Sequence, residues 1–127
     1  MRFYLAARFG RWPEMAFRTR ELQAIGHAVT SRWHQGAAQP ERMRNRCALS
    51  DDLCRIAQED LHDIDQADGV ILFTEYGMHF AGGRHVEAGY ALALGKRLFI
   101  AGPHENVFYH LPQVVQANTW QMLLKQL

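Results

Sequence analysis

Short apolar runs alternate with longer stretches in which apolar and polar residues are mixed. Runs of strand length occur at residues 2–7, 70–73 and 97–101, with an alternating stretch at 27–33 and a shorter pair at 114–115. The run at 70–73 is apolar throughout, which is typical of a central parallel strand covered on both faces. The pattern therefore predicts five strands, the third of them the most deeply buried.

Four stretches between or after these runs have helical character, at residues 14–25, 50–67, 82–96 and 119–127. The second shows apolar residues at three- and four-residue spacing, as one face of a helix requires. Pro13 suits a first helical position, and Gly26 and Gly95 suit the positions just past a helix end. Ser50 and Thr119 are side chains that cap helix N-termini. These signals predict where each helix begins and ends.

Strands and helices alternate along the chain in the order βαβ-αβ-αβ-β-α. This order predicts an α/β fold, a doubly wound (flavodoxin/Rossmann-like) parallel five-stranded sheet flanked by helices, forming a single domain over residues 1–127. Ligands of such sheets bind beyond the carboxyl ends of the strands. Segments 8–10, 74–83 and 102–107 are therefore expected around one crevice. Residues 34–49 show little periodicity and predict a loop whose length indicates a functional role.

Composition narrows the function classes. The 127 residues are 48% hydrophobic, enough for one core, and a net charge of +1 argues against binding a nucleic-acid polymer. No apolar run reaches the roughly 20 residues that span a membrane. Cys47 and Cys54 have neither zinc-ligand spacing nor a disulfide-scaffold count, and the seven histidines form no HxH or HExxH motif. We expect a cytoplasmic protein with no metal and no cofactor.

The stretch at 82–96 carries the candidate chemistry. It opens with Gly82 and Gly83, where backbone can approach a ligand closely because there is no Cβ. Glu87 is expected in the first turn of the following helix, where the helix dipole favours its ionised form. An ionised glutamate after a buried strand and a glycine turn is typical of a nucleophile that cleaves glycosidic bonds. The alternative is that Glu87 only complements the helix N-terminus.

Segments 3–7, 60–68 and 82–96 together, in this order, resemble the nucleoside 2-deoxyribosyltransferase superfamily, which also contains deoxynucleoside 5′-monophosphate N-glycosidases. The resemblance implies that Glu87 attacks the anomeric carbon of the deoxyribose. It implies that Asp60 assists the leaving base and that Tyr4 orients the glutamate. From the residues alone, Asp60 could be a solvated helix residue and Tyr4 a core aromatic.

One position departs from the family. Six residues before the nucleophile, the transferases have an aspartate for the sugar 5′-hydroxyl and the nucleotide hydrolases a serine, whereas this chain has Ala81. Basic side chains and glycine N–H groups nearby could instead hold a phosphate, or could be ordinary surface residues. The candidate substrate-binding residues are Arg8, Gly10, Arg11, Trp33, Gly82, Gly83, Arg84 and His85, with the Trp33 ring able to stack on a base or to pack in the core.

The sequence thus favours cleavage of the N-glycosidic bond of a 2′-deoxynucleoside or its 5′-monophosphate, with transfer to another base or to water. The alternative is a non-catalytic nucleotide-binding or sensing module on the same fold. The partner is a small nucleoside or nucleotide, with no nucleic acid polymer and no membrane. Because Phe108, Tyr109 and Leu111 crowd a short segment between chain breakers, we also expect a homodimer or higher homo-oligomer with residues 105–111 at its interface. Alternatively, these side chains fold back onto the core.

Overall fold

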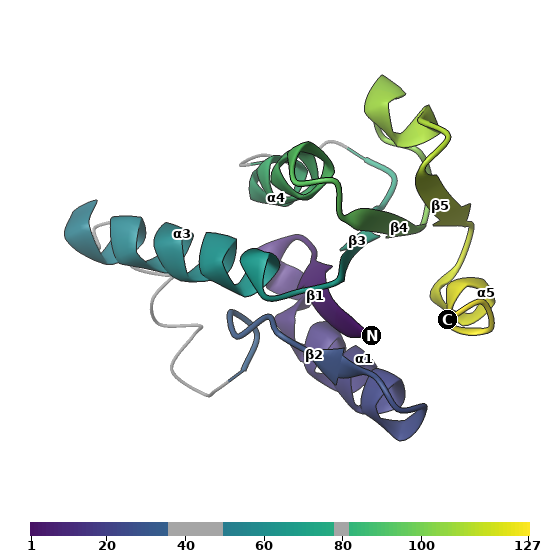
Figure 1. Cartoon of the computed structure of the whole chain (residues 1–127), viewed down its shortest axis with the longest axis horizontal. Helices are drawn as coiled ribbons and strands as arrows, with labels where there is room; N and C mark the ends of the chain where they lie inside the picture. The colour runs from purple at the N-terminus through teal and green to yellow at the C-terminus, as the bar shows by residue number, and fades with distance from the viewer. Residues whose placement is uncertain (36–49, 78–81) are drawn as a thin grey trace.

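The computed structural model describes residues 1–35, 50–77 and 82–127, and in these ranges the strands form a single parallel sheet (Figure 1). The strand order is β2-β1-β3-β4-β5. The strands are β1 (Arg2–Ala6), β2 (Ala28–Val29), β3 (Gly69–Phe73), β4 (Arg97–Ala101) and β5 (Val114–Ala117). The helices are α1 (Trp12–Ala24), α3 (Ser50–Asp65), α4 (Gly83–Ala93) and α5 (Trp120–Leu124), with 3-10 turns η1 (Phe9–Arg11) and η2 (Val107–His110).

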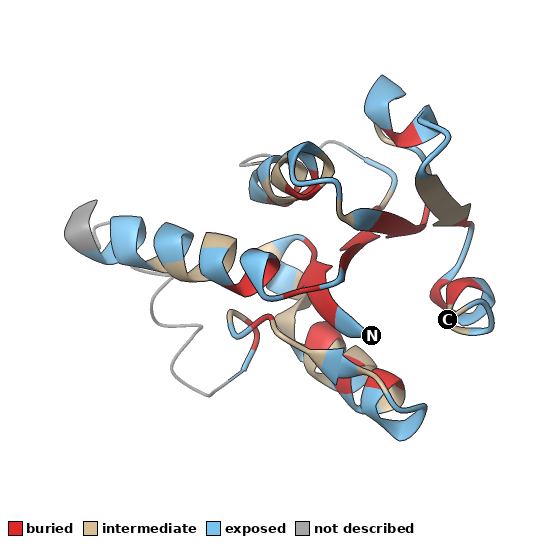
Figure 2. Cartoon of the chain, viewed as in Figure 1, coloured by how far each residue is buried: buried red, intermediate tan, exposed pale blue. Residues whose placement is uncertain are grey.

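The strand β3 is the centre of the sheet. It pairs in parallel with β1 on one side, Tyr4 opposite Val70, and with β4 on the other, Val70 opposite Leu98. Every residue of β3 is buried, as the continuous apolar run predicted (Figure 2). The fold class and the sheet predicted from the sequence are confirmed. The order of strands reverses between β1 and β3, so a ligand site is expected beyond their carboxyl ends.

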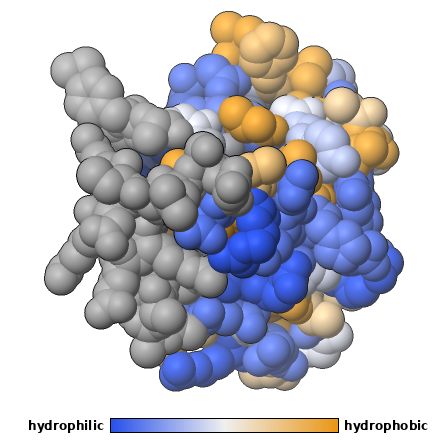
Figure 3. All heavy atoms as spheres, turned by 90° about the vertical axis from the view of Figure 1, so that its left-hand side faces the viewer, coloured by the Kyte–Doolittle hydropathy of each residue, from blue (hydrophilic) through white to orange (hydrophobic). Residues whose placement is uncertain are grey.

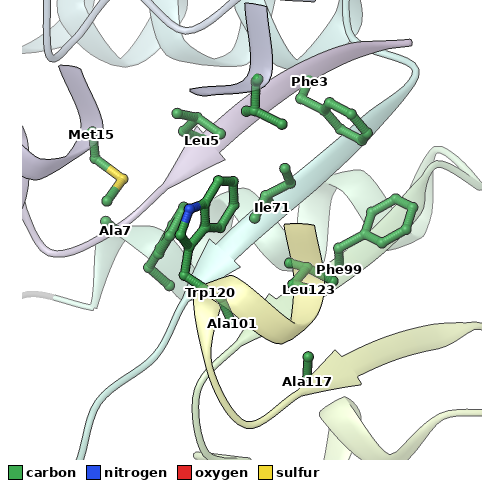
Figure 4. Close-up of a cluster of buried hydrophobic side chains, with 12 residues drawn as sticks. Phe3, Leu5, Ala7, Met15, Ile71, Phe99, Ala101, Ala117, Trp120 and Leu123 are labelled. Atoms are coloured by element: carbon green, nitrogen blue, oxygen red, sulfur yellow. The ribbon is translucent and has the colours of Figure 1, made fainter. Parts of the chain in front are cut away.

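Helices cover both faces of the sheet, and each face has its own core. On one face α1 and α5 enclose a cluster in which the Trp120 ring lies against side chains of β1 and β3, including Leu5 and Ile71 (Figure 4). On the other face α3 and α4 cover Tyr4, Val70 and Leu98 (Figure 1). Alternate side chains of β1 point to opposite faces, so Phe3 and Leu5 enter the first core and Tyr4 the second.

Two loop segments at the carboxyl edge meet because of one glycine. Gly102, directly after β4, has φ +132°, a conformation that side chains other than glycine rarely adopt. A Cβ at this position would lie 2.5 Å from the carbonyl oxygen of Thr74, the residue after β3. The absence of a side chain thus lets the segment after β4 pass closely against the end of β3.

The second strand is shorter than predicted. Only Ala28 and Val29 are in β2, whereas the alternation predicted a strand over 27–33. Beyond Val29, side chains replace the strand ladder on Leu5: its N–H donates to Ser31 Oγ, and its carbonyl accepts from Trp33 Nε1. Once both backbone groups of Leu5 are paired in this way, no further strand is needed there.

Other boundaries differ in detail. The helix capped by Thr119 is confirmed, with Oγ1 accepting from the Met122 N–H, but it ends at Leu124 rather than Leu127. The segment 105–111, expected at an oligomer interface, contains η2. Of its large side chains, Tyr109 folds back onto the core and is buried, while Phe108 is 63% exposed. The loop predicted over 34–49 lies outside the described residues from residue 36 onward, which includes Cys47. Ala81 also lies outside them.

Candidate active site

The first element of the site is a contact between β1 and α4. The Tyr4 side chain is completely buried, and its hydroxyl donates a 2.9 Å hydrogen bond to Oε1 of Glu87. Tyr4 reaches the glutamate because its position in β1 directs it to the face that α4 covers. The two residues that the family resemblance assigned to nucleophile and orienting tyrosine are therefore in direct contact.

Glu87 lies in a different environment from the one predicted. The helix α4 begins at Gly83, so Glu87 falls in its second turn, and the first turn contains no acidic residue. The side chain is half-buried, and burial raises the pKa of Glu87 to about 8, with a further increase from the charge of Asp60. The Tyr4 hydrogen bond acts in the opposite sense. The predicted first-turn position of Glu87 is wrong, and loss of hydration, rather than the helix dipole, dominates its pKa.

Asp60 on α3 belongs to the same electrostatic cluster. Its charge raises the pKa values of both Tyr4 and Glu87, so its carboxyl lies close enough to interact electrostatically with both side chains. Burial, followed by the charges of Asp63 and Glu59, raises the pKa of Asp60 to about 6. Asp60 is thus half-buried rather than fully solvated. A carboxyl with such a pKa can carry a proton near neutral pH.

Asp63 is a supporting residue that the sequence interpretation missed. It is buried, and its carboxylate accepts from Arg32 Nε at 2.9 Å and from the Arg32 backbone N–H at 3.1 Å. The contact ties the segment after β2 to α3 beside Asp60. The signal was present, since Asp60 and Asp63 are three residues apart and share a helix face, but the sequence interpretation gave Asp63 no role.

Trp33 lies between the two cores and packs against both. Its indole N–H donates to the Leu5 carbonyl at 2.7 Å, and its ring contacts those of Phe9 and His34. The neighbouring His34 is buried, which lowers its pKa to about 4 and keeps it neutral. These contacts give Trp33 a structural role in holding the segment after β2 on β1, beside any contact with a base.

The basic residues considered for phosphate binding all have carboxylate partners. Arg8 Nε donates to Glu75 at 2.7 Å, and Arg11 makes two bonds to Glu14. Arg11 also lies over the Phe73 ring, on the α1/α5 face of the sheet opposite Tyr4. The structure therefore does not bring Arg11 to the Glu87 face.

Arg84 and His85, at the start of α4, face the loop after β4. Arg84 is buried and ion-paired with Glu105, 2.8 Å from Nη2 to Oε1. The Nδ1 atom of His85 shares a hydrogen bond with the Tyr109 hydroxyl. Glu105 was not among the predicted site residues. A carboxylate just past the Gly102-Pro103 break at the carboxyl edge was the signal that could have identified it.

The three predicted glycines lie at the two turns. Gly10 is within η1, where a Cβ would lie 2.8 Å from Arg8 Nη1. Gly82 precedes α4 with φ +23°, and Gly83 is the first residue of α4 with open space around its Cβ position. Among the described residues, a Cβ at Gly83 would therefore meet no neighbour within 4 Å. In the described parts of the chain, no three His, Cys, Asp or Glu side chains converge as a metal site, and no helix is long and apolar enough to cross a membrane.

The arrangement defines a flavodoxin-like α/β protein with two carboxyl groups of raised pKa, one on α3 and one on α4, the helices that cover the same face of its sheet. Known structures share this fold over nearly the whole chain. The 2-deoxyribosyltransferase of the psychrotolerant bacterium Bacillus psychrosaccharolyticus aligns with a TM-score of 0.68 at 17% identity, covering 98% of this chain and 90% of that one. The Clostridium botulinum CMP N-glycosidase BcmB aligns with a TM-score of 0.58 at 22% identity, covering 99% and 97%.

No family model matches the sequence, and no curated protein matches it at a significant level. At 17% and 22% identity the structural likeness establishes the fold. The chain has the fold of these deoxyribosyltransferase and N-glycosidase enzymes.

Proposed function

We propose that this chain is an enzyme of the nucleoside 2-deoxyribosyltransferase superfamily that cleaves the N-glycosidic bond of a 2′-deoxynucleoside or its 5′-monophosphate, passing the sugar to another base or to water. The observation that carries the proposal is the Tyr4–Glu87 hydrogen bond within a half-buried cluster that also includes Asp60. Two carboxyl groups of raised pKa on one face of the sheet suit glycosidic chemistry.

In the first step a carboxylate oxygen of Glu87 forms a bond to C1′ as the bond from C1′ to the base nitrogen breaks. The electron pair of that bond stays on the base, and Asp60 supplies the proton that the base needs to leave. The transition state resembles an oxocarbenium ion, which the Glu87 carboxylate stabilises before the bond forms. Tyr4 holds the reacting carboxylate in position.

In the second step water, or a nitrogen of a second base, attacks C1′ of the glycosyl-enzyme. The C1′–O bond to Glu87 breaks and its electron pair returns to the carboxylate. Asp60, now ionised, takes the proton released by the attacking group. The same cluster thus supports hydrolysis or base exchange, depending on which acceptor reaches the intermediate first.

The structural neighbours support an enzyme of this kind. One is a deoxyribosyltransferase and the other a CMP N-glycosidase, and both share the fold over at least nine tenths of their own chains. The alternative, a sensing module without catalysis, derives from the unusual Ala81. It is disfavoured by the retention of Tyr4, Asp60 and Glu87 in one electrostatic cluster.

The experiment is incubation with the four 2′-deoxynucleosides and their 5′-monophosphates, followed by chromatography for released base, with and without a second base. Turnover that disappears in Glu87→Gln supports the proposal. Intact-mass spectra of the wild type should show a transient sugar adduct on Glu87. Saturable binding without any base release would favour the sensing module.

Assembly as a homodimer or higher oligomer is a further part of the proposal. Apolar atoms gather at the end of the molecule where η2 lies (Figure 3). Val107 is 76% exposed and Phe108 63%, a cluster that a monomer would leave in water. Light scattering at micromolar concentration should give a multiple of the 14.6 kDa chain mass. Phe108→Ser should lower that mass, whereas Phe17→Ser, at an exposed position of α1, should not; a wild-type monomer would refute the claim.

A further inference from the structure

The Glu105 carboxylate is held at the carboxyl edge as an internal anion. Its Oε1 accepts from Arg84 Nη2 at 2.8 Å and from the backbone N–H of Glu75 at 3.5 Å. Its Oε2 accepts from Arg84 Nε at 3.4 Å and lies 3.7 Å from His85 Nε2. The side chains of Arg84 and Glu105 are only 5% and 14% exposed. A pair this well enclosed and bidentate is not a loose surface contact.

These contacts are the ones that a bound phosphate would use. Arginine forks, backbone N–H groups and the first turn of a helix are the usual partners of phosphate oxygens. In this chain the Arg84 guanidinium, in the first turn of α4, and the backbone N–H of Glu75, after β3, both donate to the Glu105 carboxylate. The close passage at Gly102 brings the Glu105 loop against the end of β3 and makes this arrangement possible.

The position lies beside the proposed nucleophile. Arg84 and Glu87 are three residues apart on α4, and residues at this spacing are neighbours on a helix surface. In a deoxynucleoside the C1′ and C4′ atoms flank the ring oxygen, so the 5′ substituent stays close to the reacting carbon. A substrate whose C1′ faces Glu87 therefore brings its 5′ substituent toward the Arg84–Glu105 pair.

A second ion pair, Arg8–Glu75, lies next to the Arg84–Glu105 pair. Arg8 Nε donates to Glu75 Oε1 at 2.7 Å, and the backbone of Glu75 donates to Glu105. The Arg8 side chain is 44% exposed, so this pair is weaker than the enclosed one. Two of the cations that could neutralise a phosphate at this edge are thus already matched by carboxylates of the chain itself.

We infer that Glu105 determines substrate specificity. Its carboxylate occupies the position that a 5′-phosphate would take, so the site binds an unphosphorylated 2′-deoxynucleoside in preference to the 5′-monophosphate. The inference rests on the proposed function. A phosphate at this position either displaces Glu105, leaving an enclosed carboxylate without its partner, or lies beside it with like-charge repulsion. In the reactive form of the proposed mechanism Glu87 is ionised, and its charge adds to the negative charge that a phosphate dianion meets. A neutral 5′-hydroxyl meets neither penalty.

The first test compares each 2′-deoxynucleoside with its own 5′-monophosphate on the wild-type protein. We expect kcat/KM for the nucleoside to exceed that for the monophosphate by at least ~100-fold, since juxtaposed like charges are strongly unfavourable. Glu105→Gln, which removes the charge and keeps the shape, should narrow this ratio by at least ~10-fold. Asp68→Asn, in the exposed Arg2–Asp68 pair, is the control and should leave the ratio unchanged. Preference of the wild type for the monophosphate would overturn the inference.

The second test needs no turnover. Thermal unfolding is followed during titration with inorganic phosphate, against sodium chloride of equal ionic strength. The wild type should show no phosphate-specific increase in Tm, whereas Glu105→Gln should gain one. A saturable phosphate effect on the wild type would contradict the inference even if no substrate is cleaved. Absence of base release from every substrate would contradict the proposed function alone. Should Glu105→Gln not fold, both wild-type measurements still decide the question.

Discussion

The hydroxyl of Tyr4 donates a 2.9 Å hydrogen bond to Oε1 of Glu87, joining two residues 83 positions apart in the chain. The bond links the first strand to the helix that follows the central strand. Tyr4 is completely buried, so its ring can be replaced by that of phenylalanine with little change in packing. The contact is therefore open to a test that removes one oxygen atom.

Tyr4→Phe is expected to reduce kcat/KM by about 10- to 100-fold, since a hydrogen bond to a charged group contributes on the order of 1.5–3 kcal/mol. The variant should also raise the pKa of Glu87 further, because the lost bond is the one that lowers it. Steady-state kinetics across pH measures both effects.

The matched control for this prediction is Tyr90→Phe. Tyr90 is on α4, like Glu87. Its hydroxyl donates a 2.9 Å hydrogen bond to Asp65 Oδ1, and this bond is exposed. Removing it should leave the rate unchanged. Equal losses in the two variants would mean that the Tyr4 hydroxyl supports only the packing of α4.

The pH profile of the wild type should be bell-shaped, with limbs near the pKa values of about 6 and 8 that belong to the Asp60–Glu87 pair. In the proposed mechanism the reactive form has Glu87 ionised and Asp60 protonated. It carries one proton between the two groups, so activity falls when that proton is lost at high pH or a second is gained at low pH.

Asp60→Asn should lose the alkaline limb, because no proton remains to be removed from residue 60. It should also slow substrates with poor leaving bases more than those with activated bases. The control is Asp65→Asn, at an exposed position five residues further along α3, which should keep the bell-shaped pH profile. A bell that survives in Asp60→Asn would assign the alkaline limb to another group.

Stability should depend on pH through the same glutamate. Burial raises the pKa of Glu87, so folding favours its protonated form. The resulting stability is fully present below the ordinary glutamate pKa and decreases as pH rises through about 8. Glu87→Gln cannot ionise. The difference in free energy of unfolding between Glu87→Gln and the wild type should therefore shift in favour of the variant as pH rises. Between pH 5 and pH 9 we expect a shift on the order of 1–3 kcal/mol.

Urea unfolding at several pH values measures this difference. Asp52→Asn, at an exposed carboxylate near the start of α3, should track the wild type at every pH. A constant offset between Glu87→Gln and the wild type would show that Glu87 does not titrate in this range.

Hydrophobic periodicity was sufficient to predict the sheet. The run at 70–73 could only be a buried strand, and the glycines and Thr119 marked helix ends through local backbone chemistry. The second strand was overestimated because alternation does not reveal that Ser31 and Trp33 pair with the backbone of Leu5. Such replacement of a ladder by side chains depends on tertiary contacts.

The site was predicted unevenly for a related reason. The family resemblance named Tyr4, Asp60 and Glu87 as candidates, but the raised pKa of Glu87 depends on burial by distant elements, which local helix position does not reveal. From their charge and their place beside the glycine turns, the arginines could be phosphate ligands or ordinary surface residues. Their partners Glu75 and Glu105 lie 67 and 21 residues away in the chain, so the pairing appears only when the strands are assembled.

The most direct test of the central claim is the rate of base release from 2′-deoxynucleosides by the wild type and by Glu87→Gln, both checked for folding by circular dichroism. We predict release by the wild type and a loss of at least ~10³-fold in the variant, because the variant lacks the proposed nucleophile, whose charge stabilises the transition state. Near-wild-type release by a folded Glu87→Gln protein would contradict the mechanism.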